Sequence, residues 1–202
     1  AGGALVRAAA GEPWDELVAQ TVAEGLAGLE CLSGIPGSAG ATPIQNVGAY
    51  GQEVGPVIDR VHALDLASGV EHVLAGADCG FAYRSSRFRA GPERFIVLEV
   101  VYRLRPRGEP TVAYRELRRA LAVRAAAPDL GTVREAVLEL RRAKSMVLHP
   151  DDPNRRSAGS FFLDPLVEVG VASAVEVRAR ACGALAAGES MPRFAAGAGH
   201  EK

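Results

Sequence analysis

The chain has 202 residues, of which 48% are hydrophobic and 23% are charged. This composition is typical of a globular protein of one or two domains with enough length for a buried core. The net charge of −1 argues against a general nucleic-acid or anionic-membrane binder.

The cysteines and the apolar runs bound the cellular setting. Cys31, Cys79 and Cys182 are odd in number and form no C-x-x-C pair, so neither a disulfide framework nor a zinc ribbon is indicated, and a reducing compartment fits best. No run approaches the ~20 apolar residues of a membrane helix. The opening AGGALVRAAAG is broken by Arg7 and is too weakly apolar for a secretory signal. We therefore predict a cytoplasmic protein that binds neither membrane nor nucleic acid.

The first half of the chain predicts one helix and one hairpin. Residues 13–26 indicate an amphipathic helix, with Pro13 at its first position; its apolar stripe is Leu17, Val18, Thr21, Val22 and Leu26. Residues 57–66 and 70–74 read as two strands joined by a turn at Ser68-Gly69, which predicts a hairpin.

The second half contains the clearest strand and the clearest helix. FIVLEVVYRL, residues 95–104, predicts a strand. Residues 132–144 predict a helix with Thr132 and Glu135 at capping-box spacing, and residues 114–127 predict another. Residues 148–159 carry two prolines and indicate a boundary or an exposed loop, and residues 175–187 predict a further, alanine-rich helix. Because strands and helices do not alternate regularly, we predict an α+β fold.

The stretch GIPGSAGATPIQNVGAYG, residues 34–51, resembles neither a helix nor a strand. Glycine lets the backbone approach a ligand closely and adopt positive φ, and successive N–H groups form a concavity that suits phosphate or the polar edge of a flavin. Gln45 and Asn46 can both donate and accept hydrogen bonds. The plain alternative is a glycine-rich loop between two elements. The stretch matches neither the dinucleotide nor the P-loop fingerprint.

Three motifs carry a family resemblance. The glycine-rich stretch resembles the flavin-binding segment of the UDP-N-acetylenolpyruvoylglucosamine reductase (UDP-N-acetylmuramate dehydrogenase) family. CGFAYRSSRF, residues 79–88, and RSAGSFF, residues 156–162, resemble two further motifs of that family, in the same order and spacing. The resemblance covers nearly all of the chain.

The resemblance implies a fold, a reaction and two cofactors. The fold is an FAD-binding domain of the vanillyl-alcohol-oxidase/PCMH type, followed by the start of an α+β substrate domain. NADPH reduces bound FAD, and hydride then passes to the enolpyruvyl double bond of the UDP-sugar, which yields UDP-N-acetylmuramate for peptidoglycan synthesis. Other implied features are a monomer, no metal site and a cytoplasmic location.

Two residues would serve the chemistry. Ser160 is identified by its motif as the donor of a proton to the enolate-like carbanion; a serine after glycine is otherwise commonly a turn or cap residue. Arg84 would stabilise the charge that builds on the substrate carboxylate, whereas the neighbouring Arg87 and Arg89 indicate a solvated cluster as the alternative.

The remaining candidate residues follow from the same resemblance. Substrate binding falls to Tyr83, Tyr114, Lys144 and Asp164. Lys144 continues the apolar face of Val137 and Leu140, so it either snorkels at the helix end or reaches a ligand; Tyr114 could equally be a half-buried residue at a helix start. The cofactor-binding residues would be Ile35, Pro36, Gly37, Gly40, Ala41, Thr42, Gln45, Asn46, Gly48, Ala49, Tyr50 and Arg141, the last of which is about equally explained as an exposed helix charge.

The chain departs from the family pattern in several places. Ser85 stands where many members carry Asp, and Asp164 stands where Asn is usual and would add negative charge near phosphates. The phosphate loop (Gly-Ser-Asn) and the catalytic glutamate of the family have no counterpart in the sequence.

We therefore expect an incomplete chain, with an FAD-binding domain over residues 1–145 and the beginning of a substrate domain over residues 146–202. The alternatives are a non-catalytic fragment that binds flavin or UDP-sugar, and another oxidoreductase of the same fold.

Overall fold

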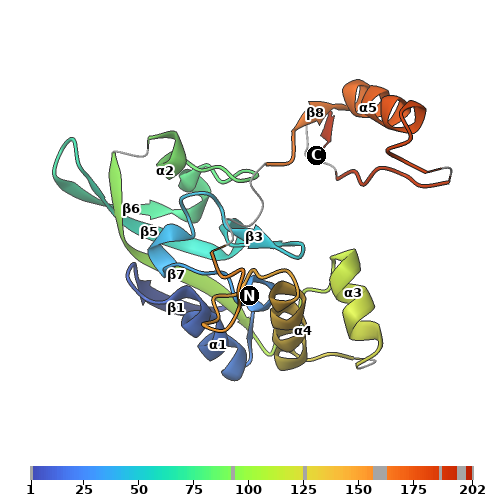
Figure 1. The fold of residues 1–202 in the computed structure, drawn as a ribbon. Coiled ribbons are helices and arrows are strands. Elements are labelled where there is room, and N and C mark those ends of the chain that lie inside the picture. Colours follow the sequence, from blue (N-terminus) through green and yellow to red (C-terminus); the bar gives the residue numbers. More distant parts are fainter. Residues whose placement is uncertain are drawn as a thin grey trace. The chain divides into compact units, whose positions relative to one another are not determined.

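The protein is described by a computed structural model that covers residues 2–91, 94–124, 127–156, 163–186, 188–194 and 199–201. The chain forms two compact units, Ala1–Ser157 and Ala158–Lys202. The first unit contains a core of sheet and helices (Figure 1), and the described residues of the second contain one helix. The described helices do not combine the length and apolar character that a membrane span requires.

The first unit is built on an antiparallel sheet with strand order β1-β7-β5-β6. Its strands are β1 (Ala4–Ala9), β5 (Ile58–Asp65), β6 (Val70–Ala75) and β7 (Phe95–Pro106). The short β2 (Leu26–Ala27) pairs with the far end of β7. In register, Val61 of β5 lies opposite Leu74 of β6 and Val100 of β7. The predicted hairpin and the predicted long strand are therefore confirmed, and so is the α+β class.

Most helices overlap their predicted ranges with shifted ends, whereas the short α2 was not predicted. The helices are α1 (Trp14–Ala23), α2 (Arg87–Ala90), α3 (Arg115–Ala122), α4 (Leu130–Arg142) and α5 (Val169–Ala181). The predicted helix over 13–26 ends early because Gly25 takes a φ of +70°, and the one over 114–127 already ends at Ala122. The prediction for residues 175–187 was displaced: α5 begins six residues earlier and ends at Ala181.

The predicted capping box of α4 was wrong. The helix begins at Leu130, and its N-cap is Asp129, whose carboxylate accepts the backbone N–H of Thr132 at 2.7 Å. Aspartate is a strong N-cap, and starting two residues earlier than predicted also buries Leu130. Thr132 therefore receives the cap and does not provide it.

Short elements complete the description. The 3₁₀ turns are η1 (Glu30–Leu32), η2 (Ala39–Ala41), η3 (Gly55–Val57) and η4 (Gly76–Cys79), and the two-residue strands are β3 (Gly48–Ala49), β4 (Gln52–Glu53), β8 (Val167–Glu168) and β9 (His200–Glu201). The strands β3 and β4 pair with each other, as do β8 and β9.

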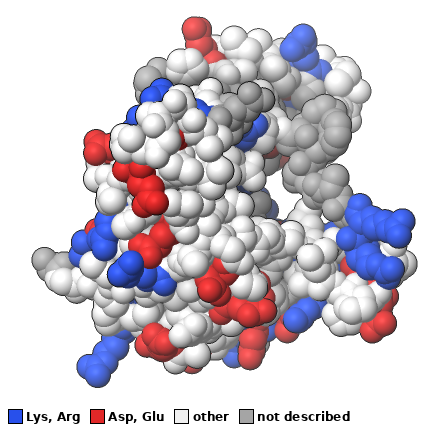
Figure 2. All heavy atoms as spheres, turned by 90° about the vertical axis from the view of Figure 1, so that its left-hand side faces the viewer, with Lys and Arg blue, Asp and Glu red and all other residues white. Residues whose placement is uncertain are grey.

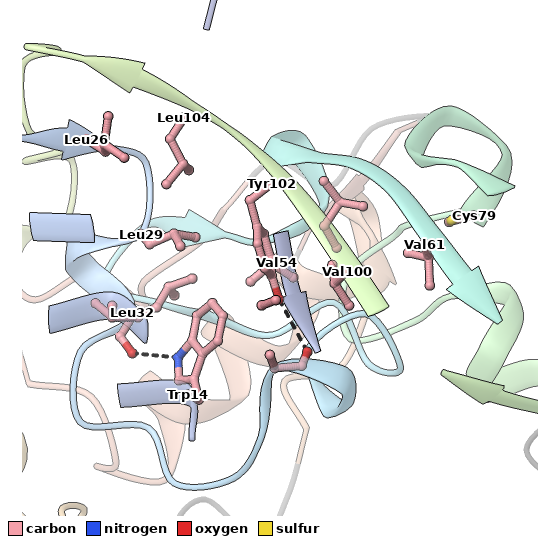
Figure 3. Packing of buried hydrophobic residues seen from close by; sticks show 14 of the residues in the cluster. Trp14, Leu26, Leu29, Leu32, Val54, Val61, Cys79, Val100, Tyr102 and Leu104 are labelled. Carbon is pink, nitrogen blue, oxygen red and sulfur yellow. Dashed lines mark hydrogen bonds between the residues drawn. The ribbon is translucent and has the colours of Figure 1, made fainter. Parts of the chain in front are cut away.

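The main core lies between the sheet and α1 (Figure 3). Trp14 is buried there; its indole N–H donates to the carbonyl of Leu32 at 3.0 Å, and its ring lies 5.8 Å from that of Tyr102. The Tyr102 hydroxyl is hydrogen-bonded to that of Thr42 at 2.9 Å. This core therefore contacts the chain on both sides of Gly34, at Leu32 and at Thr42.

A second, smaller core joins α3 and α4. It is formed by Cys31, Leu117, Leu121, Val133, Ala136 and Val137. Tyr50 and Leu140 pack against it from the side. The two helices are thus held beside the end of the glycine-rich segment.

Charged side chains of both signs are interspersed on the face of the molecule that Figure 2 shows, with uncharged surface between them. Separately, ion pairs connect neighbouring strands of the sheet, such as Arg7 with Glu99 and Arg103 with Asp59.

Candidate functional site

The glycine-rich segment, residues 34–51, packs its backbone directly against the loop that precedes α1. Gly40 N–H donates to Ala10 O, Ala39 N–H donates to Glu12 O, and Trp14 N–H donates to Gly37 O, all at 2.9–3.0 Å. A Cβ on Gly40 would lie 2.5 Å from the Ala10 Cβ, so only glycine fits. The glycines thus allow one backbone to lie against another.

Three non-glycine residues of this region have a left-handed backbone. Asn46, Tyr50 and Arg84 have φ values of 48°, 49° and 51°. Such conformations are costly for residues with a Cβ, and they concentrate at functional sites. Their occurrence in one small region therefore marks it as a candidate site.

The buried side chain of Asn46 holds the segment to neighbouring parts of the chain by hydrogen bonds. Its side chain is 2% exposed; its amide donates to the Glu53 carboxylate and to Ala82 O, and its carbonyl accepts from Gly55 N–H. Thr42 is buried in the same way and donates to Ala39 O. These two predicted cofactor residues use their side chains to shape the loop, so any contact that they make with a ligand falls to their backbone.

Arg84 is bonded to the same loop from the side. Its Nη2 donates to Gly48 O at 2.6 Å, and its Nη1 lies 3.5 Å from Asn46 O. The guanidinium also lies 5.5 Å from the ring of Tyr83. Because a guanidinium carries five N–H donors, two carbonyls leave donors for a ligand. The structure thus brings Arg84, Tyr83 and Gly48 together.

A second group surrounds Tyr50. Its ring meets that of Tyr114 edge to face at 5.6 Å, and Nζ of Lys144 lies 6.0 Å from the Tyr50 ring. Lys144 also pairs with Glu116 at 2.6 Å, a contact that raises the pKa of the lysine. Burial raises the pKa of the Tyr50 hydroxyl, against the opposing effect of Lys144. Three candidate residues from distant parts of the sequence therefore lie side by side.

Lys144 does not continue the apolar face of α4 as the sequence suggested. The helix ends at Arg142, and Lys144 lies beyond it with a side chain that is 42% exposed. A cation in this position is open to a ligand at the edge of the site.

Arg141 lies at the other end of the segment and has an unused donor. Burial lowers its pKa, and its Nη2 donates to Met146 O at 2.8 Å. Its Nε is buried without a hydrogen-bond partner among the described residues, and a Cβ on Gly34 would lie 3.4 Å from it. A buried N–H beside a glycine fits a ligand that offers an acceptor atom, as the oxygens of a flavin nucleotide do.

The remaining cofactor candidates differ in exposure. Pro36, Gly37, Ala41 and Gln45 are exposed, Ile35, Gly48 and Ala49 are half-buried, and Gly40 is buried. The exposed members form the outer side of a segment whose inner side is fixed by hydrogen bonds.

Two candidates lie outside the described residues of the first unit. Ser160 lies outside the described residues. Asp164 is exposed and belongs to the second unit. Their roles therefore stay predictions.

Sequence reasoning missed four residues that hold the segment in place. Asp15 accepts Gly34 N–H at 2.6 Å and pairs with Arg134 of α4. Glu30 and Gln52 form a buried network at the other end. The signal for Glu30 was a lone acid within the apolar run GLAGLECLSG, because an acid in such a run must find partners.

Comparison with known proteins agrees with the geometry. Residues 1–74 match the sequence profile of a family described as FAD binding domain. This stretch, which contains the glycine-rich segment, is thus similar to FAD-binding domains, in line with the resemblance that the motifs carry.

Individual relatives narrow the similarity from FAD-binding domains in general to one kind of reductase. The chain is 50% identical over 203 residues to the UDP-N-acetylenolpyruvoylglucosamine reductase of Streptomyces coelicolor, covering 99% of the chain and 52% of that protein. With the protein of the same name from Salinispora arenicola it shares 54% over 168 residues, or 81% of the chain and 45% of that protein.

A solved structure agrees as well. The crystal structure of a UDP-N-acetylenolpyruvylglucosamine reductase from Thermus caldophilus matches with a TM-score of 0.55 and 26% identity, over 79% of the chain and 48% of that protein. These comparisons confirm the family resemblance carried by the three motifs. The chain spans about half the length of the curated relatives that it matches.

Proposed function

We propose that the chain serves the flavin-dependent reduction of UDP-N-acetylglucosamine enolpyruvate to UDP-N-acetylmuramate, a cytoplasmic step of peptidoglycan precursor synthesis with NADPH as reductant. The observation that carries the proposal is the convergence of Arg84, Tyr50, Tyr114, Arg141 and Lys144 on one glycine-rich segment. The reductases that match the chain at about 50% identity support it.

We assign the cofactor and the substrate to the two parts of the chain that the sequence predicts. Residues 1–145 would hold FAD along the segment from Ile35 to Tyr50, and residues 146–202 would begin the substrate domain. When bound, FAD supplies the hydride chemistry. The exposed backbone around Gly37 and the unused Nε of Arg141 are the groups that would hold it.

The substrate-binding roles use the charges at the edge of the site. Lys144 would bind the UDP-sugar diphosphate, and Tyr114 would lie over the sugar. Arg84 would place its guanidinium against the substrate carboxylate, whose charge grows as the double bond is reduced. Tyr83 and Asp164 would help to position the substrate, and Ser160 would return a proton to the carbanion. We also expect a monomer.

A titration of the chain with FAD tests the cofactor assignment. We expect saturable binding with a changed flavin absorbance spectrum. Gly48→Val should abolish it, because a Cβ there would lie 2.7 Å from Cγ of Glu53 and 3.0 Å from Gln52 O. Gly11→Ala is the matched control, since a Cβ at Gly11 meets nothing within 4 Å.

The reaction is then tested on the flavin-loaded chain without oxygen. NADPH should bleach the flavin absorbance, and UDP-N-acetylglucosamine enolpyruvate should restore it. If the wild-type chain binds no FAD, or if the substrate fails to restore the absorbance, this chain does not carry the proposed function.

A further inference from the structure

Glu30 is a fully buried carboxylate close to the candidate site. Its side chain is 0% exposed. Its Oε2 accepts Gly28 N–H at 2.7 Å, and its Oε1 accepts Thr111 N–H at 2.7 Å and the Gln52 amide at 3.1 Å. A buried charge is costly unless it is hydrogen-bonded, and here three donors from three segments meet it.

Gln52 extends this arrangement into a network. Its carbonyl accepts Cys31 N–H at 2.9 Å, and its amide also donates to the Thr111 hydroxyl at 3.1 Å. The Cys31 thiol donates to Thr111 O at 3.1 Å. Each of the three segments is therefore bonded to both of the others.

The network lies next to the Tyr50–Tyr114 pair along both segments of the chain. Gln52 follows Tyr50 by two residues, and Thr111 precedes Tyr114 by three. Between them a Cβ on Gly51 would lie 3.3 Å from the Ala113 Cβ, so the two backbones are already in contact. Glu30 therefore joins the two backbone segments that carry the rings.

We propose that Glu30 is a positioning residue, whose carboxylate holds Gln52 and Thr111 so that Tyr50 and Tyr114 meet where the flavin and the UDP-sugar bind. The ligands named here rest on the proposed function. The role requires a carboxylate because all three partners are N–H donors and an ionised carboxylate only accepts. A glutamine of the same shape would turn an N–H toward one of them.

The first test measures the ring pair without any ligand. In the wild-type chain, NMR should show NOE contacts between the rings of Tyr50 and Tyr114, and Glu30→Gln should remove them. Asp65→Asn is the matched control, because Asp65 is 4% exposed and accepts hydrogen bonds from Ala67 and Arg94 at the hairpin turn. Ring contacts that persist in a folded Glu30→Gln chain would overturn the proposal.

The second test measures the FAD dissociation constant. Glu30→Gln should raise it about tenfold, the effect of one unsatisfied buried donor, while Asp65→Asn should change it less than about twofold. Tyr114 is 38% exposed, so Tyr114→Ala is expected to fold. In the Tyr114→Ala background, Glu30→Gln should raise the FAD dissociation constant by less than a further factor of about two, because both changes act through the same ring pair.

The outcomes separate the two proposals. Equal loss of affinity in Glu30→Gln and Asp65→Asn, or full additivity with Tyr114→Ala, would reduce Glu30 to a stability residue and overturn its positioning role. Absence of FAD binding by the wild-type chain would instead refute the proposed function, and the ring contacts would still decide the role of Glu30.

Discussion

The glycine-rich segment and the β5–β6 hairpin are both turn-containing stretches of the first unit, but local contacts predominate in the hairpin turn, to which Arg94 adds a more distant one. In the hairpin the Asp65 backbone carbonyl accepts Gly69 N–H and its carboxylate accepts Ala67 N–H. The glycine-rich segment is instead held by Asp15 and Arg84, from two other parts of the chain, and Glu30 binds Gln52 directly after it. Only the second kind of turn fixes groups from several elements in one place, which a binding site requires.

Removing the Trp14 side chain should produce the largest difference in stability between the glycine-rich segment and the hairpin. The side chain is 1% exposed and supports the segment through Leu32 and Tyr102. Trp14→Ala should cost about 3–5 kcal/mol of unfolding free energy, measured by urea denaturation. Hydrogen exchange should speed up in residues 34–51 before it does in the hairpin.

Trp14→Phe is the control for the ring. It keeps an aromatic ring in the core and leaves Leu32 O without its partner, which should cost about 1–2 kcal/mol. Simultaneous loss of protection in the hairpin and the segment would show that one cooperative unit holds both.

Two glycine substitutions sharpen the comparison. Gly40 has no room, since a Cβ would lie 2.5 Å from the Ala10 Cβ, whereas Gly69 has nothing within 4 Å but a φ of +69°. Gly40→Ala should cost about 1–3 kcal/mol through overpacking and weaken FAD binding. Gly69→Ala should cost about 1 kcal/mol through backbone strain and leave FAD binding unchanged. Equal effects of both on the FAD titration would contradict this division.

The same contrast explains what the sequence could predict. The hairpin, the strand from Phe95 and the approximate places of the helices depend on neighbours in the sequence, so periodicity and turn residues indicate them. Helix ends depend on which residue caps them, and α4 is capped by Asp129 although Thr132 has the capping-box spacing. The glycine-rich segment was recognised because its conformational demands leave glycines in the sequence.

The contacts that build the site could not be predicted in this way. Glu30 and Thr111 are 81 residues apart, and Asp15 and Arg134 are 119 apart, so no local pattern relates them. Lys144 was expected on the apolar face of a helix, but the chain leaves the helix first and the lysine pairs with Glu116 of α3. Composition suggests that such a site exists, whereas tertiary packing decides which side chains reach it.

The smallest expected effect concerns Asp15, which accepts a hydrogen bond from Gly34, the first residue of the segment. Burial would raise its pKa, but hydrogen bonds from Arg134 and from Gly34 N–H lower it below the ordinary value of 3.8. A lowered pKa contributes stability that is fully present above the ordinary value and is lost as the pH falls through the folded value. Asp15→Asn should therefore cost about 1 kcal/mol at neutral pH, because the pair is partly exposed. The difference from wild type in urea unfolding free energy should shrink below about pH 4.

Asp65→Asn serves as the hairpin control, because the pKa of Asp65 is also lowered. It should show a similar pH dependence without weakening FAD binding. A difference between Asp15→Asn and wild type that stays constant from neutral pH to pH 3 would show that the charge of Asp15 does not hold the segment.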